Sequence, residues 1–497
     1  MAVVGDRPYP PGAYGVVVVG SGPGALQTSY SLRALGVPHA VLSADEEPGG
    51  MFRRFPVFER LISWTKPHAP FERGTREYEW YDHNSLLAAE RENRALVPEF
   101  MDGTFSVPSR LEMEAGLRAF AERTGLEIRY GCRWEATRRE DDGLVLVTSD
   151  GEYRCRAAVF AVGVTEPWKA AIPGVEDAPH YTETGDPSEY SGQRVFIIGK
   201  RNSGFEVATG LLPWASQLVL ASPRPVETAF LGRLPVRVRY LEPLDEYARG
   251  GAGAFVVDAA IERVERRDGG FRVVTRGTTR PGELVFDAER VLVATGFRTP
   301  LLDLPAQGLA TVSDGRIPAL TPYWESVSMP GVFFAGNATQ GAPGLRKQGL
   351  ASNSSSVNGF RYNAAVLARH LAESLFGIRV ERPRLEPDEV VPYLLSELAR
   401  APELWVQKGY LARVLTFDDE IRDEGILPLE HFVDQAGPDA VAVAVEMDSK
   451  ATIYPAVYAR SSGKLIERAL PAHPTHAFES EEYRRELASV LGGLVQA

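Results

Sequence analysis

A glycine-rich turn near the N-terminus has the composition and spacing of a dinucleotide-binding site. The residues before it, Tyr14–Gly20, form a continuous β-branched run typical of a buried parallel strand, and Leu26–Leu35 fits a helix. Gly20 permits the tight turn, Gly22 lets the backbone approach a pyrophosphate, and Ala25 is small enough for the helix to pack on the strand. A pyrophosphate would then bind at the positive N-terminus of the helix. The candidate binding residues of this turn are Gly20, Gly22, Gly24 and Ala25.

The second strand, Ala40–Ser43, ends on a hydroxyl where dinucleotide-binding folds usually carry an acidic residue. Ser43 can still hydrogen-bond the adenosine ribose, although more weakly than a carboxylate would. We therefore expect Ser43 to contribute a neutral contact to the nucleotide site.

Three later segments point to FAD as the dinucleotide. Pro48–Met51 follows the second strand, Val291–Gly296 is a buried strand ending in an Ala-Thr-Gly turn, and Gly331–Asn337 is a further buried strand. Segments of this kind occur in this order in flavoproteins with two dinucleotide folds, where the last one touches the ribityl chain and the flavin phosphate. Asn337 stands in place of the usual acid, so it keeps a hydrogen-bonding side chain without the charge. The candidate FAD contacts of these segments are Gly50, Met51, Gly296, Gly336 and Asn337.

A second fingerprint of the same kind begins at Gly192–Gly199, another buried strand. It resembles the NAD(P)H half of these flavoproteins, except that Arg201 replaces the middle glycine. That glycine normally gives the cofactor phosphates room, so the arginine side chain must swing aside or meet them. The candidate NAD(P)H contacts are Gly199, Arg201, Asn202, Ser203, Gly204 and, after the next strand, Arg224.

Two interpretations of Arg201 remain open. In one, its guanidinium pairs with the pyrophosphate and Lys200 adds to a cationic lip. In the other, the nucleotide site is vestigial and the enzyme is a flavin oxidase or dehydrogenase. We favour a working site because Arg224 follows the strand Leu218–Ser222, where a 2′-phosphate would be held. This position favours NADPH, with NADH as the alternative. The other interpretation of Arg224 is a solvated loop arginine without a ligand.

The chain resembles the two-dinucleotide-binding-domain flavoproteins, the superfamily of class B flavin monooxygenases and thioredoxin reductases. The segments Phe52–Pro56, Leu61–Lys66 and Tyr81–Leu86 look most like its FAD-dependent oxidoreductase domain-containing branch. The resemblance implies an α/β fold with two Rossmann-like dinucleotide-binding domains. We expect an FAD domain at 1–187 and 291–380 with an NAD(P)H domain inserted at 188–290. Residues 381–497 are expected to form a small α+β domain, with helices over Glu389–Leu415 followed by strands and a charged terminal helix.

The resemblance also implies a reaction. In such enzymes NAD(P)H reduces FAD, and the reduced flavin passes oxygen from O₂ to a substrate. We therefore expect a monooxygenase that oxygenates a small metabolite, with N-hydroxylation of an amine or amino acid in a natural-product pathway as one option. The alternatives are the oxidase or dehydrogenase described above and a flavin-stabilised binding or redox-sensing protein without turnover.

Two segments are candidates for the substrate pocket. Met51–Asn84 is rich in aromatic and cationic residues, and Gln340–Asn353 directly follows the late FAD strand. Aromatic rings and cations in an acidic protein favour a substrate with a carboxylate or phosphate. The candidate catalytic residues in these segments are Lys66, His83, Arg346 and Lys347.

Bulk properties exclude several other functions. The net charge of −12 disfavours nucleic acids and anionic membranes as partners, and no apolar run is long enough to span a bilayer. We therefore expect a cytoplasmic protein. For the C-terminal residues 381–497 we expect one of two roles: they cover the active site or they form a homodimer. Cys132 and Cys155 are 23 positions apart with no C-x-x-C pair, so a thiol–disulfide relay is not expected. The eight histidines lack metal-ligand spacing, so no metal site is expected.

Overall fold

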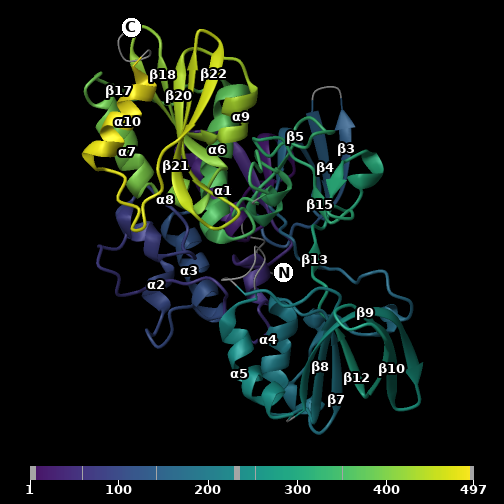
Figure 1. Ribbon diagram of the computed structural model, residues 1–497. Helices are drawn as coiled ribbons and strands as arrows, with labels where there is room; N and C mark the ends of the chain where they lie inside the picture. The colour runs from purple at the N-terminus through teal and green to yellow at the C-terminus, as the bar shows by residue number, and fades with distance from the viewer. Residues whose placement is uncertain are drawn as a thin grey trace. The chain divides into compact units, whose positions relative to one another are not determined.

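The computed structural model describes residues 7–58, 60–140, 143–228, 236–251, 253–349 and 351–492 (Figure 1). Residues 1–6, at the start of the predicted FAD domain, and Glu59 and Leu350, in the two predicted pocket segments, lie outside these ranges. The chain divides into two compact units. Unit 1 comprises Met1–Arg53, Ser63–Val164 and Thr299–Ala497, and unit 2 comprises Arg54–Ile62 and Thr165–Arg298.

The first sheet of unit 1 is built around a parallel β-α-β arrangement. Strand β1 pairs in parallel with β2 on one side and β5 on the other, and helix α1 connects β1 to β2. Strand β4 pairs with the first half of β5, and β16 pairs with its end at Ala158–Phe160. The elements are β1 (Gly12–Val19), α1 (Pro23–Ala34), β2 (His39–Leu42), α2 (Val97–Phe100), α3 (Arg110–Arg123), β3 (Trp134–Glu140), β4 (Gly143–Thr148), β5 (Gly151–Phe160), β14 (Thr311–Val312), β15 (Ile317–Pro318), β16 (Val332–Phe334) and α6 (Val357–Phe376).

The sheet of unit 2 repeats this plan. Strands β12, β7, β8 and β9 run parallel, and β9, β10 and β11 form an antiparallel meander at the other edge. Because β12 pairs with β7, this strand lies in the second sheet, although the sequence placed it at the start of the returning FAD segment. The elements are β6 (Glu166–Pro167), β7 (Arg194–Ile198), α4 (Asn202–Leu211), β8 (Gln217–Ser222), α5 (Val238–Arg249), β9 (Ala254–Arg267), β10 (Gly270–Gly277), β11 (Glu283–Ala288), β12 (Arg290–Val293) and β13 (Phe297–Arg298).

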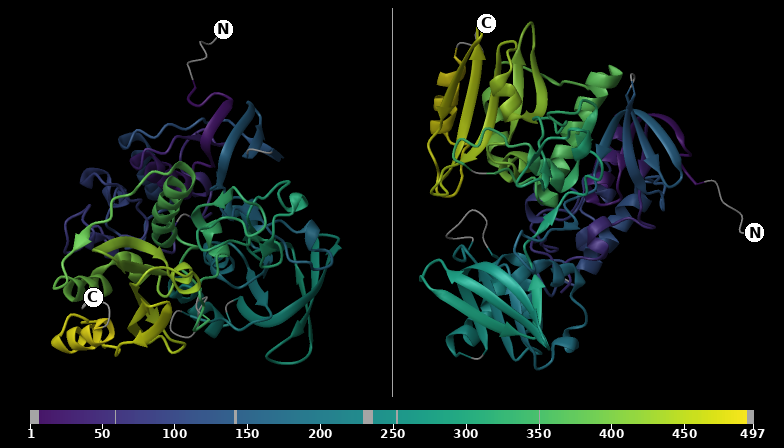
Figure 2. Two further views of the ribbon diagram at one scale, coloured as in Figure 1. Left: turned by 90° about the horizontal axis from the view of Figure 1, so that it is seen from above. Right: turned by 90° about the vertical axis from the view of Figure 1, so that its right-hand side faces the viewer.

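The C-terminal part of unit 1 is an antiparallel sheet in the order β17-β19-β18-β20-β21-β22. Helices α7, α8 and α10 cover one face and α9 covers the other (Figure 1). Figure 2 shows the terminal helix, in yellow, beside this sheet. The elements are β17 (Arg384–Leu385), α7 (Val390–Arg400), α8 (Pro402–Val406), β18 (Leu411–Phe417), β19 (Ile421–Pro428), α9 (Leu429–Asp434), β20 (Ala440–Met447), β21 (Ile453–Ser461), β22 (Lys464–Ala469) and α10 (Glu481–Leu491).

The predicted helical stretch Glu389–Leu415 is wrong in its last part. Residues from Leu411 onward form β18, because this segment pairs with both β19 and β20. Its apolar residues fill both faces of the sheet, so local periodicity alone could not distinguish it from a buried helix. The two-Rossmann α/β fold class and the terminal helix are as predicted.

Among the described residues, no helix combines the length and apolarity that crossing a bilayer would require. No group of three or more His, Cys, Asp or Glu side chains among them is arranged to hold a metal ion.

Candidate functional site

Glycines from three predicted FAD segments meet in unit 1. A methyl group added to Gly24 would lie 2.5 Å from the Gly336 Cα, and one added to Gly50 would lie 2.8 Å from the Gly22 Cα. The backbones of the first fingerprint, the Pro48–Met51 turn and the late strand therefore approach as closely as glycine allows. This cradle fits the backbone-lined pyrophosphate site that the fingerprint predicts for FAD.

The turn before α1 has the geometry that a phosphate site needs. Gly20 has φ +130°, a conformation that favours glycine, and its N–H donates to the Leu42 carbonyl at 2.7 Å. Helix α1 begins after Gly22 with no side-chain cap, so its first backbone N–H groups remain available for an anion. Gly22, Gly24 and Ala25 are buried, as the close packing of helix on strand requires.

The structure uses Ser43 differently from the prediction. Its side chain is 2% exposed, donates to Ser21 Oγ at 2.9 Å and accepts from the Asp45 N–H at 3.1 Å. Ser21 in turn donates to Asp45 Oδ2 at 3.2 Å. The partly exposed carboxylate of Asp45 therefore lies beside the first fingerprint, two residues after Ser43, where an acidic residue was expected. Sequence reasoning missed Asp45, although its place directly after the strand was a usable signal.

The late strand β16 ends in a tight turn that carries the other FAD candidates. Gly336 has φ +72° and begins a short 3₁₀ segment, Gly336–Gly341, that includes Asn337. Thr339 Oγ1 donates to the Gly336 carbonyl at 2.6 Å, and Gln340 Nε2 donates to the Asn337 carbonyl at 2.7 Å. Met51 lies in a second short 3₁₀ segment, Gly50–Arg53.

The second fingerprint forms a similar turn in unit 2. Gly199 has φ +119° and donates its N–H to the Ala221 carbonyl at 2.8 Å, which joins the ends of β7 and β8. A side chain on Gly204 would strike the Gly199 carbonyl, so α4 packs directly on the turn. Arg201 precedes the helix with an exposed side chain, while Asn202 and Ser203 begin it half-buried.

Lys200 does not form part of a cationic lip. Its side chain is 1% exposed and is ion-paired with Asp258 of β9, which pairs with Ser222 at the end of β8. Burial opposes ionisation of Asp258, but the hydrogen bonds from Lys200 and Thr279 hold the pKa of this carboxyl below its ordinary value. The Lys200 charge is therefore neutralised inside unit 2.

Arg237 lies next to the first residue of α4 through its backbone. Its backbone N–H donates to Asn202 Oδ1 at 3.1 Å, which ties this segment to the start of α4. Burial and the neighbouring Arg239 guanidinium lower the pKa of Arg237. Arg224 is exposed just after β8. Arg201 thus directly precedes α4 and the Arg237 backbone is tied to its first residue, and sequence reasoning identified Arg201 and Arg224 but missed Arg237.

Gly296 closes a turn within unit 2. Its carbonyl accepts from the Trp168 N–H and from His180 Nε2, both at 3.0 Å. His180 is fully buried, and burial lowers its pKa, which favours the neutral ring that donates through Nε2. The predicted contact of Gly296 with FAD stays a prediction, because the hydrogen bonds to its carbonyl say nothing about a contact with FAD.

Glu206 holds the segment Arg54–Ile62 in unit 2. This α4 carboxylate is 6% exposed and accepts from the Phe58 N–H at 3.0 Å and from the Tyr181 hydroxyl at 2.8 Å. The Tyr181 hydroxyl also accepts from the Val57 N–H at 3.1 Å. Burial raises the pKa of Glu206, and burial together with this carboxyl raises that of Tyr181.

Two of the four catalytic candidates share one cluster. The Lys66 ammonium lies 4.6 Å from the ring centre of Trp64 and 5.5 Å from that of Tyr81. The His83 ring meets Trp64 edge-on at 4.8 Å. Within the described part of the chain, Lys66 forms no ion pair with a carboxylate, and the Trp64 side chain is 36% exposed. We call Trp64, Lys66, Tyr81 and His83 the aromatic cluster.

The other two candidates lie in the segment after the late FAD strand and have different roles. The Lys347 ammonium is ion-paired with buried Glu446 at 3.0 Å and with Glu467, and it donates to the Tyr458 hydroxyl at 2.7 Å. These partners occupy the ammonium, so Lys347 is an anchor in the structure. Arg346 is exposed with φ +47°, and its Nε donates to the Pro343 carbonyl at 3.2 Å.

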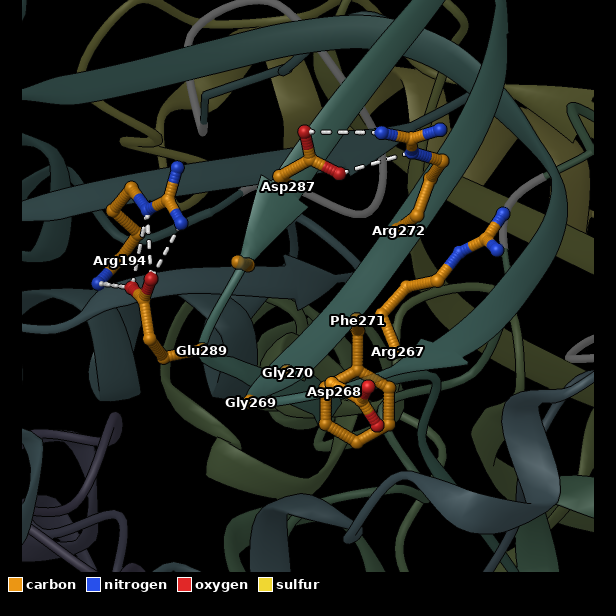
Figure 3. A pocket seen from close by; sticks show the side chains of 10 residues that line it. Arg194, Arg267, Asp268, Gly269, Gly270, Phe271, Arg272, Asp287 and Glu289 are labelled. Atoms are coloured by element: carbon orange, nitrogen blue, oxygen red, sulfur yellow. Dashed lines mark hydrogen bonds and ion pairs between the residues drawn. The ribbon is translucent and has the colours of Figure 1, made fainter.

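A polar surface pocket of about 460 Å³ lies elsewhere in unit 2 (Figure 3). Arg194, at the start of β7, pairs with Glu289, and Arg272 pairs with Asp287 at 3.0 Å. The pocket therefore lies at the opposite end of β7 from Gly199. Because its guanidinium groups are already paired with carboxylates, it is a poor candidate for the nucleotide site.

Comparison with known proteins agrees with this geometry. The family model for pyridine nucleotide-disulphide oxidoreductase matches residues 17–336. FAD-dependent oxidoreductase domain-containing protein 2 of Danio rerio is 25% identical over 459 residues, which cover 80% of this chain and 64% of that protein. The chain thus spans less than two thirds of this curated relative.

Solved structures show the same fold. A flavin-containing monooxygenase from Stenotrophomonas maltophilia has a TM-score of 0.54 at 22% identity, covering 72% of this chain and 98% of that one. The ornithine N-hydroxylase of Kutzneria sp. 744 has a TM-score of 0.54 at 16% identity, covering 74% and 99%.

The family match confirms the predicted resemblance to flavoproteins with two dinucleotide folds, and the solved structures share this fold. The chain belongs to the pyridine nucleotide-disulphide oxidoreductase family.

Proposed function

We propose that this protein is an FAD-dependent monooxygenase that uses NADPH and O₂ to oxygenate a small anionic metabolite. The observation that carries the proposal is the convergence of Gly22, Gly24, Gly50 and Gly336 on one backbone-lined cradle, together with the arginine-flanked N-terminus of α4. Bound FAD would supply electron transfer from the nicotinamide and the activation of oxygen. The chain itself would bind both nucleotides, orient the substrate and exclude water.

Thiol chemistry is the main alternative that the family name suggests, and the cysteines argue against it. Both are buried, and burial raises the pKa of Cys155 to about 12 and also raises that of Cys132. A redox thiol needs an accessible, low-pKa sulfur, usually with a resolving partner. Neither side chain meets this requirement, so we infer that the flavin passes electrons to a non-thiol acceptor.

The aromatic cluster supports an anionic substrate. The Lys66 ammonium is held over two aromatic rings without a described carboxylate partner, so it can bind an external carboxylate or phosphate. The exposed Trp64 ring beside it offers an apolar surface for the rest of the molecule. N-hydroxylation of an amino acid remains one option, since an amino acid carries the required carboxylate.

Stopped-flow spectra of the purified protein test the reaction. The proposal predicts that NADPH bleaches the oxidised flavin without substrate and that admission of O₂ then produces an oxygenated flavin spectrum. If NADPH leaves the flavin oxidised while a substrate bleaches it, the oxidase or dehydrogenase alternative is correct. A flavin that no reductant bleaches would instead indicate a non-catalytic protein.

Arg201→Gln should weaken NADPH binding about tenfold and leave FAD content unchanged. The exposed guanidinium precedes α4, where it can pair with cofactor phosphates, and a lost charge-assisted hydrogen bond costs about 1.5 kcal/mol. Titration of flavin reduction against NADPH concentration measures the effect. Arg249→Gln, whose side chain is 81% exposed at the end of α5, is the matched control. Equal behaviour of the two variants would remove Arg201 from the cofactor site.

Lys66→Met should raise the KM for an acidic substrate roughly tenfold and leave NADPH-driven flavin reduction unchanged, because it removes a charge used in ground-state binding. Methionine keeps much of the apolar contact with Trp64 and Tyr81. NADPH consumption in the presence and absence of substrate separates the two steps. Lys464→Met, on exposed strand β22, controls for loss of a surface cation. A Lys66→Met protein with a normal KM would exclude Lys66 from substrate binding.

A further inference from the structure

A chain of buried hydrogen bonds connects the C-terminal part of unit 1 to the late FAD turn. Gln407 Nε2 donates to Asn363 Oδ1 at 2.8 Å, and Asn363 Nδ2 donates to Thr339 Oγ1 at 3.0 Å. The Thr339 hydroxyl donates to the Gly336 carbonyl at 2.6 Å. Every donor points the same way along the chain. Such aligned hydrogen bonds polarise and strengthen one another.

The side chains of this hydrogen-bond chain are buried, and their hydrogen bonds fix the orientation of both amides. Gln407 and Asn363 are 0% exposed, and Thr339 is 2% exposed. The Gln407 amide oxygen accepts from the Asn353 N–H at 2.8 Å, which sets the orientation of the whole amide. Ser354 Oγ accepts a second hydrogen bond from both amides. Both side-chain amides therefore use donor and acceptor, and neither can flip without leaving a buried group unpaired.

Gln407 reaches this position because the C-terminal elements carry it there. It follows α8 directly and donates its N–H to the Glu403 carbonyl at 3.0 Å. Three residues later, the Tyr410 hydroxyl accepts from Trp324 Nε1 at 2.9 Å, and its ring lies against Gly344. The segment 407–410 is thus bound at several points to the part of unit 1 that contains the late strand.

We propose that Gln407 is a positioning residue for FAD, acting through Asn363 and Thr339 on the Gly336 turn. This inference rests on the proposed function, because it assumes that the turn contacts FAD. Gly336 has φ +72°, and a methyl group added to Gly24 would lie only 2.5 Å from its Cα. A small rotation of its peptide would therefore move the backbone that lines the cradle. The C-terminal part of unit 1 is accordingly a component of the flavin site.

Two substitutions interrupt the chain at different points with little change in shape. Gln407→Glu keeps the acceptor for Asn353 but replaces the amide donor to Asn363 with a carboxylate oxygen. Thr339→Val removes the hydroxyl that donates to Gly336, and Thr339→Ser restores it. Thr275→Val is the matched control. Thr275 is 0% exposed, against 2% for Thr339, and it too donates to a backbone carbonyl, that of Leu284 at 3.1 Å in unit 2.

The dissociation constant of FAD, measured by fluorescence titration of the apoprotein, tests the inference together with the visible spectrum of the bound flavin. We expect Gln407→Glu and Thr339→Val each to weaken FAD binding at least tenfold and to alter the spectrum. Thr339→Ser should bind FAD within twofold of wild type. The double variant should bind only as weakly as the worse single variant, because both changes break one chain. Thr275→Val should lose stability without losing FAD.

Two failures are distinguishable. If wild-type protein binds no FAD, the proposed function is wrong and the inference falls with it. If wild type binds FAD while Gln407→Glu and Thr339→Val bind it as well as Thr275→Val does, only the inference is overturned. Should Gln407→Glu not fold, Thr339→Val alone decides, because it changes the last donor of the chain.

Discussion

Gly24→Ala should produce a folded protein that retains less than roughly a tenth of the FAD of wild type. The added methyl group would lie 2.5 Å from the Gly336 Cα and 2.7 Å from its nitrogen. Both are backbone atoms, so no side chain can move away to make room. The start of α1 must therefore separate from the late FAD turn, and overpacking of this kind costs about 1–3 kcal/mol. Each loss of about 1.4 kcal/mol in the free energy of FAD binding weakens the binding about tenfold.

The ratio of flavin to protein absorbance after purification measures this loss, and titration with added FAD extends the range. Gly12→Ala is the matched control, because a methyl group on this β1 residue would make only an ordinary contact, 3.7 Å from the Pro10 carbonyl. We expect that variant to keep its FAD. A Gly24→Ala protein with full flavin content would show that FAD does not depend on the contact between Gly24 and Gly336.

Arg361→Met should destabilise unit 1 by about 3–5 kcal/mol, the range seen when one partner of a buried charged network is removed. Arg361 lies on α6 with 1% exposure, and its guanidinium donates to the Asp82 and Ser85 carbonyls at 2.9 Å each. Its charge also faces the carboxylate of Glu79, which is 3% exposed. The substitution leaves these carbonyls without a donor and Glu79 with Arg94 as its remaining described cation.

Urea denaturation measures the loss, and hydrogen exchange should place it first at residues 79–85. Arg384→Met, at a 57% exposed side chain on β17, should change stability by less than about 0.5 kcal/mol. A loss in Arg361→Met no larger than in this control would contradict the assigned role. Burial already raises the pKa of Glu79 above its ordinary 4.5, and removal of Arg361 should raise it further. In the variant the ionised Glu79 carboxylate is the form that destabilises the folded state. The loss of stability should therefore shrink as the pH falls toward 4.5, because Glu79 becomes protonated.

The two nucleotide-binding turns could be predicted from local sequence alone. At Gly20–Ala25 and Gly199–Gly204 the conformation depends on neighbours in the chain: a β-branched strand, glycines with positive φ and a helix that begins directly afterwards. Strand, turn and helix propensities act over a few residues, so they can be evaluated without knowing the rest of the fold. The same is true of the terminal helix, whose periodicity is clear from its own residues.

The pairing of the polar side chains, in contrast, depends on contacts between elements that are distant in the sequence. Lys200 and Lys347 read as available cations, yet Asp258 and Glu446, 58 and 99 positions away, neutralise them. Arg237 and Gln407 gave no local signal, because their roles arise from contacts with Asn202 and Asn363 that distant elements bring together. Charge and hydrogen-bond pairing depend on distance in space, whereas the spacing of residues along a chain reports only on its local conformation.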